Sequence, residues 1–304
     1  MKMKKFIPVC SSLLAGNELN YVDTAVKTGW ISSAGEYVEK FEKKFAEYCG
    51  MKYAASVCNG TAALHLALLA AGIKEGDEVI IPCFTMIATA FAVCYAGAMP
   101  VFVDADAGTW NINAGKIEEK ISSKTKAIIP VHIFGLPCDM DKISAIAKKN
   151  KLKIIEDAAE AHGAECKKKK TGSFSDIAAF SFFANKNLTT GEGGMVVTNN
   201  RKFFDNARYF KNMCFDLNGP RNYMHSDIGF NYRMTNLQAA VGLAQTEKAD
   251  YYRSLRINNG KLYRKFLQNI PGIIFQNDNP EFTNVYWMNG ILVEPKKYGR
   301  TKDE

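Results

Sequence analysis

The middle of the chain alternates short apolar runs with segments whose apolar residues recur at helical spacing. Six runs predict strands, at residues 78–82, 100–104, 127–133, 153–157, 177–183 and 194–198, and the segments 86–95, 114–121 and 140–150 predict helices. Strands that are apolar throughout and separated by helices are typical of an α/β fold, with a mostly parallel sheet and helices on both faces. In such sheets ligands bind at the carboxyl ends of the strands.

The pattern changes after Thr235. Residues 236–269 predict one or two long helices, and residues 272–275 and 285–293 predict strands of a smaller lobe. We therefore expect a large domain over residues 1–240 and a small carboxyl-terminal domain over residues 241–304. The chain ends soon after the turn-like stretch EPKKYGR, when the small domain still has few elements, so we expect this domain to be truncated.

Composition and charge narrow the class of protein. With 304 residues and 47% hydrophobic content, the chain can bury one large core and a smaller appended lobe. Its net charge is +8, but no Arg-rich arm, zinc-finger spacing or basic helix with interleaved aromatics accompanies that charge, so we expect no nucleic-acid partner. The lysine run 167–170, followed by Thr-Gly-Ser, predicts the tip of a hairpin.

The cysteines and the amino-terminal segment indicate in which cellular compartment the protein is found. The 8 cysteines are scattered without a CxxC pair, which indicates reduced thiols in a cytoplasmic protein. The start MKMKKFIPVCSSLLAG imitates a secretion signal, but Pro8 and the early polar residues interrupt its apolar stretch. Because no run approaches the ~18 apolar residues of a membrane span, we expect no membrane segment. The four histidines show no metal spacing, so we expect no metal site.

A lysine in an unusual setting is the first candidate for chemistry. In FSFFANKNLTTGEGGMVVTN, residues 180–199, Lys186 follows an aromatic strand end and precedes a glycine-rich loop. Aromatic surroundings desolvate an amine and lower its pKa, which suits a lysine that forms a covalent link to a carbonyl compound. The glycines allow the backbone to approach a bound ring closely.

Two further motifs supply partners for a bound ring. In IIEDAAEAHGA, residues 154–164, Asp157 ends a predicted strand, where it either caps a helix or faces a cation such as a protonated pyridine nitrogen. In VCNGTAALHLALLAAG, residues 57–72, Gly60 and Thr61 open an apolar helix whose N–H groups can hold a phosphate. Ser181 can contribute a hydroxyl group to the same phosphate. His132 and His162 follow strands near this site and are candidate ligand contacts.

Together these motifs resemble the DegT/DnrJ/StrS family of sugar aminotransferases. The resemblance covers essentially the whole chain and includes TGWISSAGEYVEKFEKKFAEYCG, VDADAGTWNI, PVHIFGLPCDMDKI and GFNYRMTNLQAAVGLAQ. It implies a fold-type I aminotransferase that depends on pyridoxal 5'-phosphate (PLP). The forms EDAAEA and NK…TTGEGGMV look most like those of GDP-perosamine synthases. This implies amination of GDP-4-keto-6-deoxymannose to GDP-perosamine, with glutamate as amino donor.

The resemblance also implies a role for each matching residue. Lys186 matches the lysine that carries the cofactor and moves protons, and Asp157 matches the partner of the pyridine nitrogen. The phosphate cradle is matched by Gly60, Thr61 and Ser181, and a small residue beneath the ring by Ala159. Asn231, in GFNYR, matches an asparagine that reaches the phosphate of the neighbouring subunit's cofactor. A homodimer with shared active sites is therefore implied.

The chain departs from the family pattern in three ways. Met86 stands where many members stack an aromatic residue on the cofactor ring, and a thioether can also pack on a π face. Glu160 replaces the commoner Gln or His beside the 3′ oxygen of the cofactor, where two anionic oxygens would require a shared proton. The chain also ends several tens of residues before its relatives do, which implies either a fragment or an impaired protein.

Two other functions remain open at this point. One is an aminotransferase that acts on a UDP-linked keto sugar. The other is a non-catalytic regulator or remnant on the same scaffold, which only the early end favours. A 3-dehydratase of the same fold would carry histidine where this chain has Lys186, so this residue argues directly against that class.

Overall fold

The computed structural model describes residues 6, 8–217 and 223–304. Its main sheet has seven strands in the order β1-β9-β8-β5-β4-β2-β3. The bounds of these strands are β1 Tyr53–Val57, β2 Glu78–Pro82, β3 Met99–Val103, β4 Thr125–Ile128, β5 Lys153–Asp157, β8 Ile177–Ser181 and β9 Gly194–Thr198. Only β9 runs against the others, since it is antiparallel to both β1 and β8 while the remaining neighbours are parallel. The predicted mostly parallel sheet is therefore confirmed.

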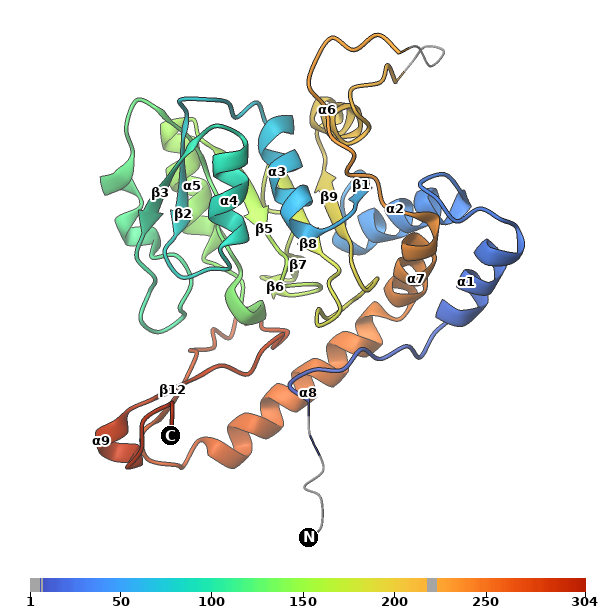
Figure 1. Cartoon of the computed structure of the whole chain (residues 1–304). Coiled ribbons are helices and arrows are strands. Elements are labelled where there is room, and N and C mark those ends of the chain that lie inside the picture. Colours follow the sequence, from blue (N-terminus) through green and yellow to red (C-terminus); the bar gives the residue numbers. More distant parts are fainter. Residues whose placement is uncertain (1–5, 7, 218–222) are drawn as a thin grey trace.

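Helices cover both faces of this sheet (Figure 1). On one face, α3 (Gly60–Ala70), α4 (Ala88–Tyr95) and α6 (Arg201–Lys211) share an apolar core with the sheet. On the other face, α2 (Glu36–Cys49) and α7 (Asn236–Glu247) pack over β8 and β9, and α5 (Met140–Asn150) packs over β4 and β5. The first helix, α1 (Glu18–Lys27), packs against α7. This arrangement is the α/β class predicted from the sequence.

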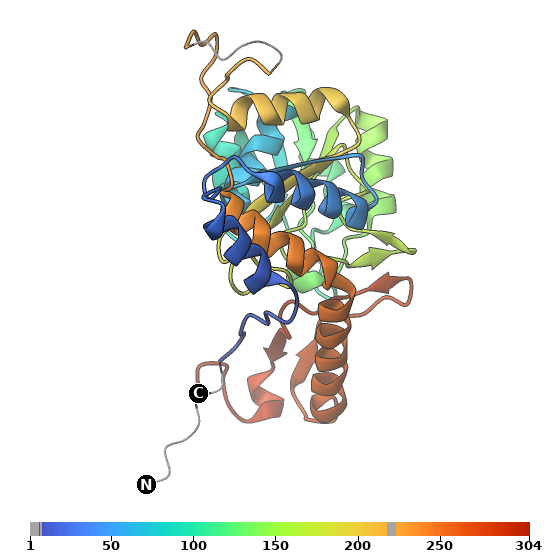
Figure 2. The same ribbon diagram turned by 90° about the vertical axis from the view of Figure 1, so that its right-hand side faces the viewer.

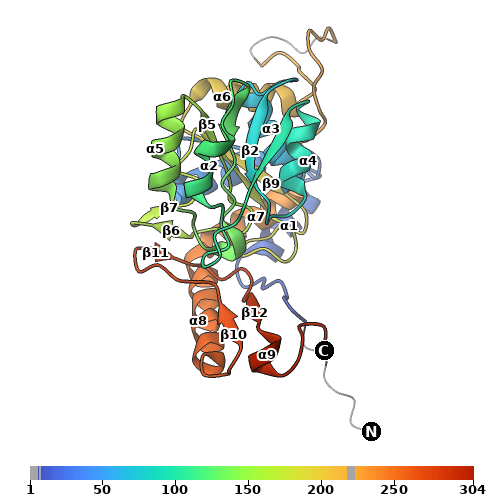
Figure 3. The same ribbon diagram turned by 90° about the vertical axis from the view of Figure 1, so that its left-hand side faces the viewer.

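A smaller lobe lies beside the long helix α8 (Ala249–Leu267), as Figures 2 and 3 both show. It contains the antiparallel pair β10 (Ile273–Phe275) and β12 (Ile291–Val293), and the short helix α9 (Pro295–Tyr298). A second connection to the large part is a three-stranded sheet, in which β11 (Phe282–Thr283) pairs with β6 (Glu165–Cys166), and β6 pairs with β7 (Lys169–Lys170). The turn between β6 and β7 contains Lys167 and Lys168, so the predicted hairpin tip is confirmed.

Several segments differ from the sequence prediction. The strand predicted over 127–133 ends at Ile128, because Pro130 has no N–H group with which to continue the ladder. Residues 114–121 form two short 3-10 helices, η1 (Ala114–Lys116) and η2 (Glu118–Lys120), since Asn113 caps Gly115 locally and no regular helix follows. A third 3-10 turn, η3, spans Ile133–Gly135. Of the strand predicted over 285–293, only 291–293 pairs, because the chain bends at Tyr286 (φ 47°).

Candidate active site

A pocket of about 360 Å³ opens where five parallel strands of the sheet end. Its lining residues follow the carboxyl ends of β1, β2, β4, β5 and β8, and Trp287 of the small lobe completes the wall. Eight of the nine site residues proposed from the sequence line this pocket: Gly60, Thr61, Met86, Asp157, Ala159, Glu160, Ser181 and Lys186. The pocket therefore lies at the edge of the sheet where ligands bind in α/β folds, as the sequence predicted.

One corner of the pocket has the features of an anion site. The side chain of Asn59 accepts a hydrogen bond from the N–H group of Ala62 at 2.8 Å and so caps α3. The first N–H groups of a helix have no acceptor within it, and here they belong to Gly60 and Thr61. A Cβ atom at Gly60 would lie 2.6 Å from the Cβ atom of Ser181, so only glycine allows the serine hydroxyl to approach this helix end. The corner fits a phosphate group.

Asp157 is buried at the end of β5, with 4% of its surface exposed. One of its carboxylate oxygens accepts a hydrogen bond from the hydroxyl of Thr89 at 2.8 Å, and the other from the N–H group of Ala159 at 3.2 Å. Burial raises the pKa of Asp157, and the hydrogen bond from Thr89 opposes that shift. A carboxylate held in this way at a pocket wall is suited to a cationic ring nitrogen.

Lys186 lies in the turn after β8, and its Nζ is 3.6 Å from the ring centroid of Trp287. Burial lowers the pKa of Lys186, whereas the carboxylates of Glu160 and Asp157 act in the opposite direction. The indole is held in place because its Nε1–H group donates to the carbonyl of Asn185 at 2.9 Å. The amine is therefore desolvated and directed into the pocket, as a lysine that attacks a carbonyl requires.

Glu160 is 7% exposed and accepts a hydrogen bond from the N–H group of Phe134 at 2.7 Å. Burial raises the pKa of Glu160 to about 7. Near neutral pH this carboxyl group can therefore hold a proton. That is the condition under which it can lie beside an anionic oxygen of a ligand.

The raised pKa of Glu160 predicts a change in stability with pH. A carboxyl group whose pKa rises from 4.5 to about 7 on folding contributes stability that is fully present below pH 4.5 and is lost as the pH rises through 7. Relative to Glu160→Gln, we expect the free energy of unfolding of the apoprotein to fall by up to about 3 kcal/mol across this window. Denaturant titrations of both proteins from pH 4.5 to 8 measure this difference.

The control for this prediction is Glu47→Gln, which alters an exposed carboxylate on α2. This variant should follow the pH profile of the parent chain. A constant difference between the parent and Glu160→Gln at every pH would contradict the assigned burial effect.

Met86 and Asn231 agree less well with the predicted site. Met86 lines the pocket just before α4 but is 68% exposed. Asn231 does not line the pocket. It is exposed, and its backbone forms an isolated antiparallel β-bridge with Asn212. Its predicted reach to a neighbouring subunit stays a prediction.

The two histidines considered as ligand contacts do not line the pocket. His132 is buried and bonded to Glu156. His162 packs among the rings of Phe180 and Phe182, and burial lowers the pKa of His162 to about 3. Within residues 6, 8–217 and 223–304, no group of His, Cys, Asp or Glu side chains is arranged to hold a metal ion.

Two contributors to the pocket were missed in the sequence. Thr89 fixes the carboxylate of Asp157, and its hydroxyl lies 2.9 Å from that of Thr85. The spacing of these threonines at the start of an apolar helix is the signal that could have indicated a shared polar role. Trp287 lies in the segment predicted as a plain strand, and nothing local to it points to Lys186.

Comparison with known proteins assigns this chain to a family. Residues 13–304 match the model of the DegT/DnrJ/EryC1/StrS aminotransferase family. The chain belongs to this family. The predicted family and the dependence on PLP are confirmed, and the chain is a PLP-dependent aminotransferase.

Individual relatives and solved structures agree with this assignment. GDP-perosamine synthase of Escherichia coli O157:H7 is 49% identical over 95% of this chain and 78% of its own length. The GDP-perosamine synthase of Caulobacter vibrioides is 52% identical over 82% of this chain and 67% of its own length. The structure of DesV from S. venezuelae has a TM-score of 0.87 at 34% identity, covering 91% of this chain and 74% of that one. NtdA of Bacillus subtilis, solved with bound cofactor PMP, has a TM-score of 0.84 at 31% identity, covering 97% and 69%.

Proposed function

We propose that the chain transfers an amino group from glutamate to C4 of GDP-4-keto-6-deoxymannose and forms GDP-perosamine. The observation that carries this proposal is that one pocket brings together Lys186, Asp157 and the corner formed by Gly60 and Ser181. Relatives named GDP-perosamine synthase are 40 to 52% identical, and this supports the choice of nucleotide and sugar. The UDP-linked and regulatory alternatives are not favoured by these relatives.

The residues of the pocket fit PLP. The corner at Gly60, Thr61 and Ser181 suits its phosphate, Asp157 suits its ring nitrogen, and Lys186 lies where its aldehyde would need an amine. When bound, PLP supplies an electron sink for negative charge at the substrate carbon. The small side chain of Ala159 would leave room beneath the ring, and the thioether of Met86, which also lines the pocket, could pack against that ring.

The side chains of the pocket would have distinct roles in the reaction. Lys186 would hold the cofactor covalently and would carry a proton to or from the reacting carbon. The carboxylate of Asp157 would keep a proton on the ring nitrogen. Glu160, which can be protonated near pH 7, would offer that proton to the 3′ oxygen. The indole of Trp287 covers Lys186 and excludes water from its amine.

We further propose that the enzyme is a homodimer whose sites are shared. Beside the pocket, α4 and the residue before it expose the apolar side chains of Ile87, Phe91 and Tyr95. A cluster of exposed apolar side chains is typical of an interface. Asn231 is exposed and therefore free to contact a partner's phosphate.

The domain division and the cellular location are also proposals. We keep a large PLP-binding domain at 1–240 and a small domain at 241–304. No helix among the residues that the structure describes is long and apolar enough to cross a membrane. All eight cysteines are free thiols, and this supports a cytoplasmic reaction.

Product analysis tests the proposed function. Purified protein would receive GDP- and UDP-linked 4-keto-6-deoxy sugars separately, with glutamate as amino donor, and the products would be resolved by mass spectrometry and NMR. We expect amination of the GDP sugar at C4, with the UDP sugar slower by at least tenfold. Preferential amination of the UDP sugar, or amination at C3, would contradict the proposal.

A further inference from the structure

Glu156 is a fully buried carboxylate that the proposed chemistry does not use. It precedes Asp157 on β5, and successive strand residues point to opposite faces of a sheet. Asp157 lines the pocket, whereas Glu156 faces the opposite side, toward His132 and the turn 172–175. The two carboxylates are thus joined by one peptide but lie in separate environments.

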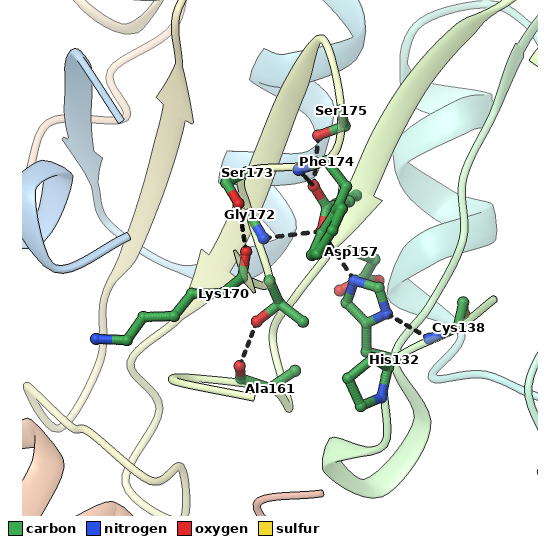
Figure 4. Close-up of polar contacts among 12 residues, drawn as sticks. His132, Cys138, Asp157, Ala161, Lys170, Gly172, Ser173, Phe174 and Ser175 are labelled. Atoms are coloured by element: carbon green, nitrogen blue, oxygen red, sulfur yellow. Dashed lines mark hydrogen bonds and ion pairs between the residues drawn. The ribbon is translucent and has the colours of Figure 1, made fainter. Parts of the chain in front are cut away.

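Four donors surround the carboxylate of Glu156. The N–H group of Gly172 donates to Oε2 at 2.7 Å, and His132 Nε2 lies 3.0 Å from the same oxygen. Oε1 accepts from the N–H group of Phe174 at 2.9 Å and from the hydroxyl of Ser175 at 2.8 Å. Figure 4 shows the imidazole of His132 between Cys138 and this cluster, with the turn from Gly172 to Ser175 on the other side.

The tautomer of His132 follows from its second nitrogen. The backbone N–H group of Cys138 donates to His132 Nδ1 at 3.0 Å, so Nδ1 carries a lone pair and the proton lies on Nε2. A neutral imidazole therefore donates to Glu156. Burial alone would raise the pKa of Glu156, but the hydrogen bonds from His132, Gly172 and Ser175 outweigh it and hold that pKa below its ordinary value.

The cluster is connected to the backbone on both sides of Asp157. The N–H group of His132 donates to the carbonyl of Asp157 at 3.3 Å, and the N–H group of Asp157 donates to the carbonyl of Pro130 at 3.0 Å. The turn 172–175 leads directly into β8, which ends in Ser181. The ionised Glu156 thereby ties together three segments whose ends form the pocket.

We propose that Glu156 is a positioning residue that acts through His132 and the turn 172–175 to fix the direction of the Asp157 carboxylate. The proposal rests on the proposed function only in taking Asp157 as the partner of the ring nitrogen. A glutamine at position 156 has one oxygen where two are needed, and its amide hydrogens would face N–H donors. The end of β5 would then shift, and Asp157 would lose its alignment with the cofactor.

A double-mutant cycle with Asp157→Asn tests this role. In the parent chain, Glu156→Gln should raise the PLP dissociation constant at least tenfold and lower kcat at least tenfold, with KM for the GDP sugar unchanged within twofold. In the Asp157→Asn background, the same substitution should change either quantity less than twofold. Equal effects in both backgrounds would show a merely structural role and overturn the proposal.

Glu42→Gln serves as the matched control. Glu42 is a part-buried carboxylate that accepts hydrogen bonds from the N–H group and hydroxyl of Ser56, and it does not line the active-site pocket. Its substitution should lower the unfolding temperature but show equal effects on PLP binding with and without Asp157. Coupling of Glu42 to Asp157 as strong as that of Glu156 would overturn the proposal.

Two further measurements cover the case in which Glu156→Gln does not fold. His132→Phe removes the Nε2–H donor to Glu156 and should show the same coupling to Asp157 in PLP binding. In the apoprotein of the parent chain, ¹⁵N NMR should find His132 as the Nε2–H tautomer, and an Nδ1–H tautomer would overturn the proposal. Both readouts need no sugar, so failure to aminate the GDP sugar would count against the proposed function alone.

Discussion

Replacement of Lys186 by alanine is expected to abolish turnover while the protein still folds. The lysine is desolvated, lies 3.6 Å from the Trp287 ring, and faces Asp157 and Glu160 across the pocket. In the proposed function it is both the covalent tether and the proton carrier, and proton transfer alone contributes about 10²- to 10⁴-fold. We therefore expect kcat to fall by about 10⁴-fold or more. Steady-state assays with the GDP sugar measure the loss, and circular dichroism checks the fold.

The site of covalent attachment gives a direct control. Borohydride reduction of the PLP-loaded parent chain, followed by peptide mass spectrometry, should find the cofactor on Lys186. Lys170→Ala, which alters a partly buried lysine that lies over the ring of Tyr48 outside the pocket, should remain active and be labelled as the parent is. Attachment of PLP to another lysine would refute the assignment.

The Lys186→Ala variant also tests whether the active sites of a dimer are shared. An Asn231→Ala subunit keeps Lys186, and a Lys186→Ala subunit keeps Asn231, so a mixed dimer has one complete site if Asn231 reaches across. Each variant alone should have low activity, and mixing them after dissociation should restore up to about a quarter of the parent's activity per subunit, because half of the dimers are mixed and each has one site. No recovery in mixed dimers of verified composition would contradict the shared site.

The sequence predicts the sheet well where burial dominates. The segments 78–82, 153–157 and 194–198 agree with β2, β5 and β9 because each of these buried strands contains an adjacent pair of β-branched apolar residues, which the local pattern shows. β1 was missed because YAASV consists largely of small residues with weak strand preference, and its place is set by antiparallel pairing with the distant β9. Pairing between distant segments is not encoded in a local pattern.

The pocket was predictable to the extent that its residues lie in compact motifs. Asp157 and Ser181 end a strand, Gly60 and Lys186 come shortly after one, and parallel strands bring their carboxyl ends to one edge of the sheet. Trp287 reaches the pocket from the small lobe through a bend at Tyr286. The network around Glu156 likewise joins segments from 132 to 175. Such contacts depend on tertiary packing, which one sequence does not reveal.

Asp157→Asn is the second substitution expected to have a large effect. Asparagine keeps the volume and can still accept the hydrogen bonds from Thr89 or Ala159, but it loses the charge. A hydrogen bond to a charged group contributes about 1.5–3 kcal/mol. Loss of the charge that keeps the ring nitrogen protonated should therefore lower kcat by about two orders of magnitude, with a smaller effect on KM for the GDP sugar.

Asp176→Asn is the matched control for this substitution. Asp176 accepts a hydrogen bond from the N–H group of Ile154 at 2.9 Å, at the opposite end of β5 from the pocket. Both variants remove a carboxylate that accepts a backbone hydrogen bond at or next to an end of β5, so a general loss of stability should affect them alike. Only Asp157→Asn should lose turnover at a temperature where both proteins are folded. Near-normal kcat in Asp157→Asn would mean that Asp157 only caps the turn at Ala159, since a neutral amide performs that task as well as a carboxylate.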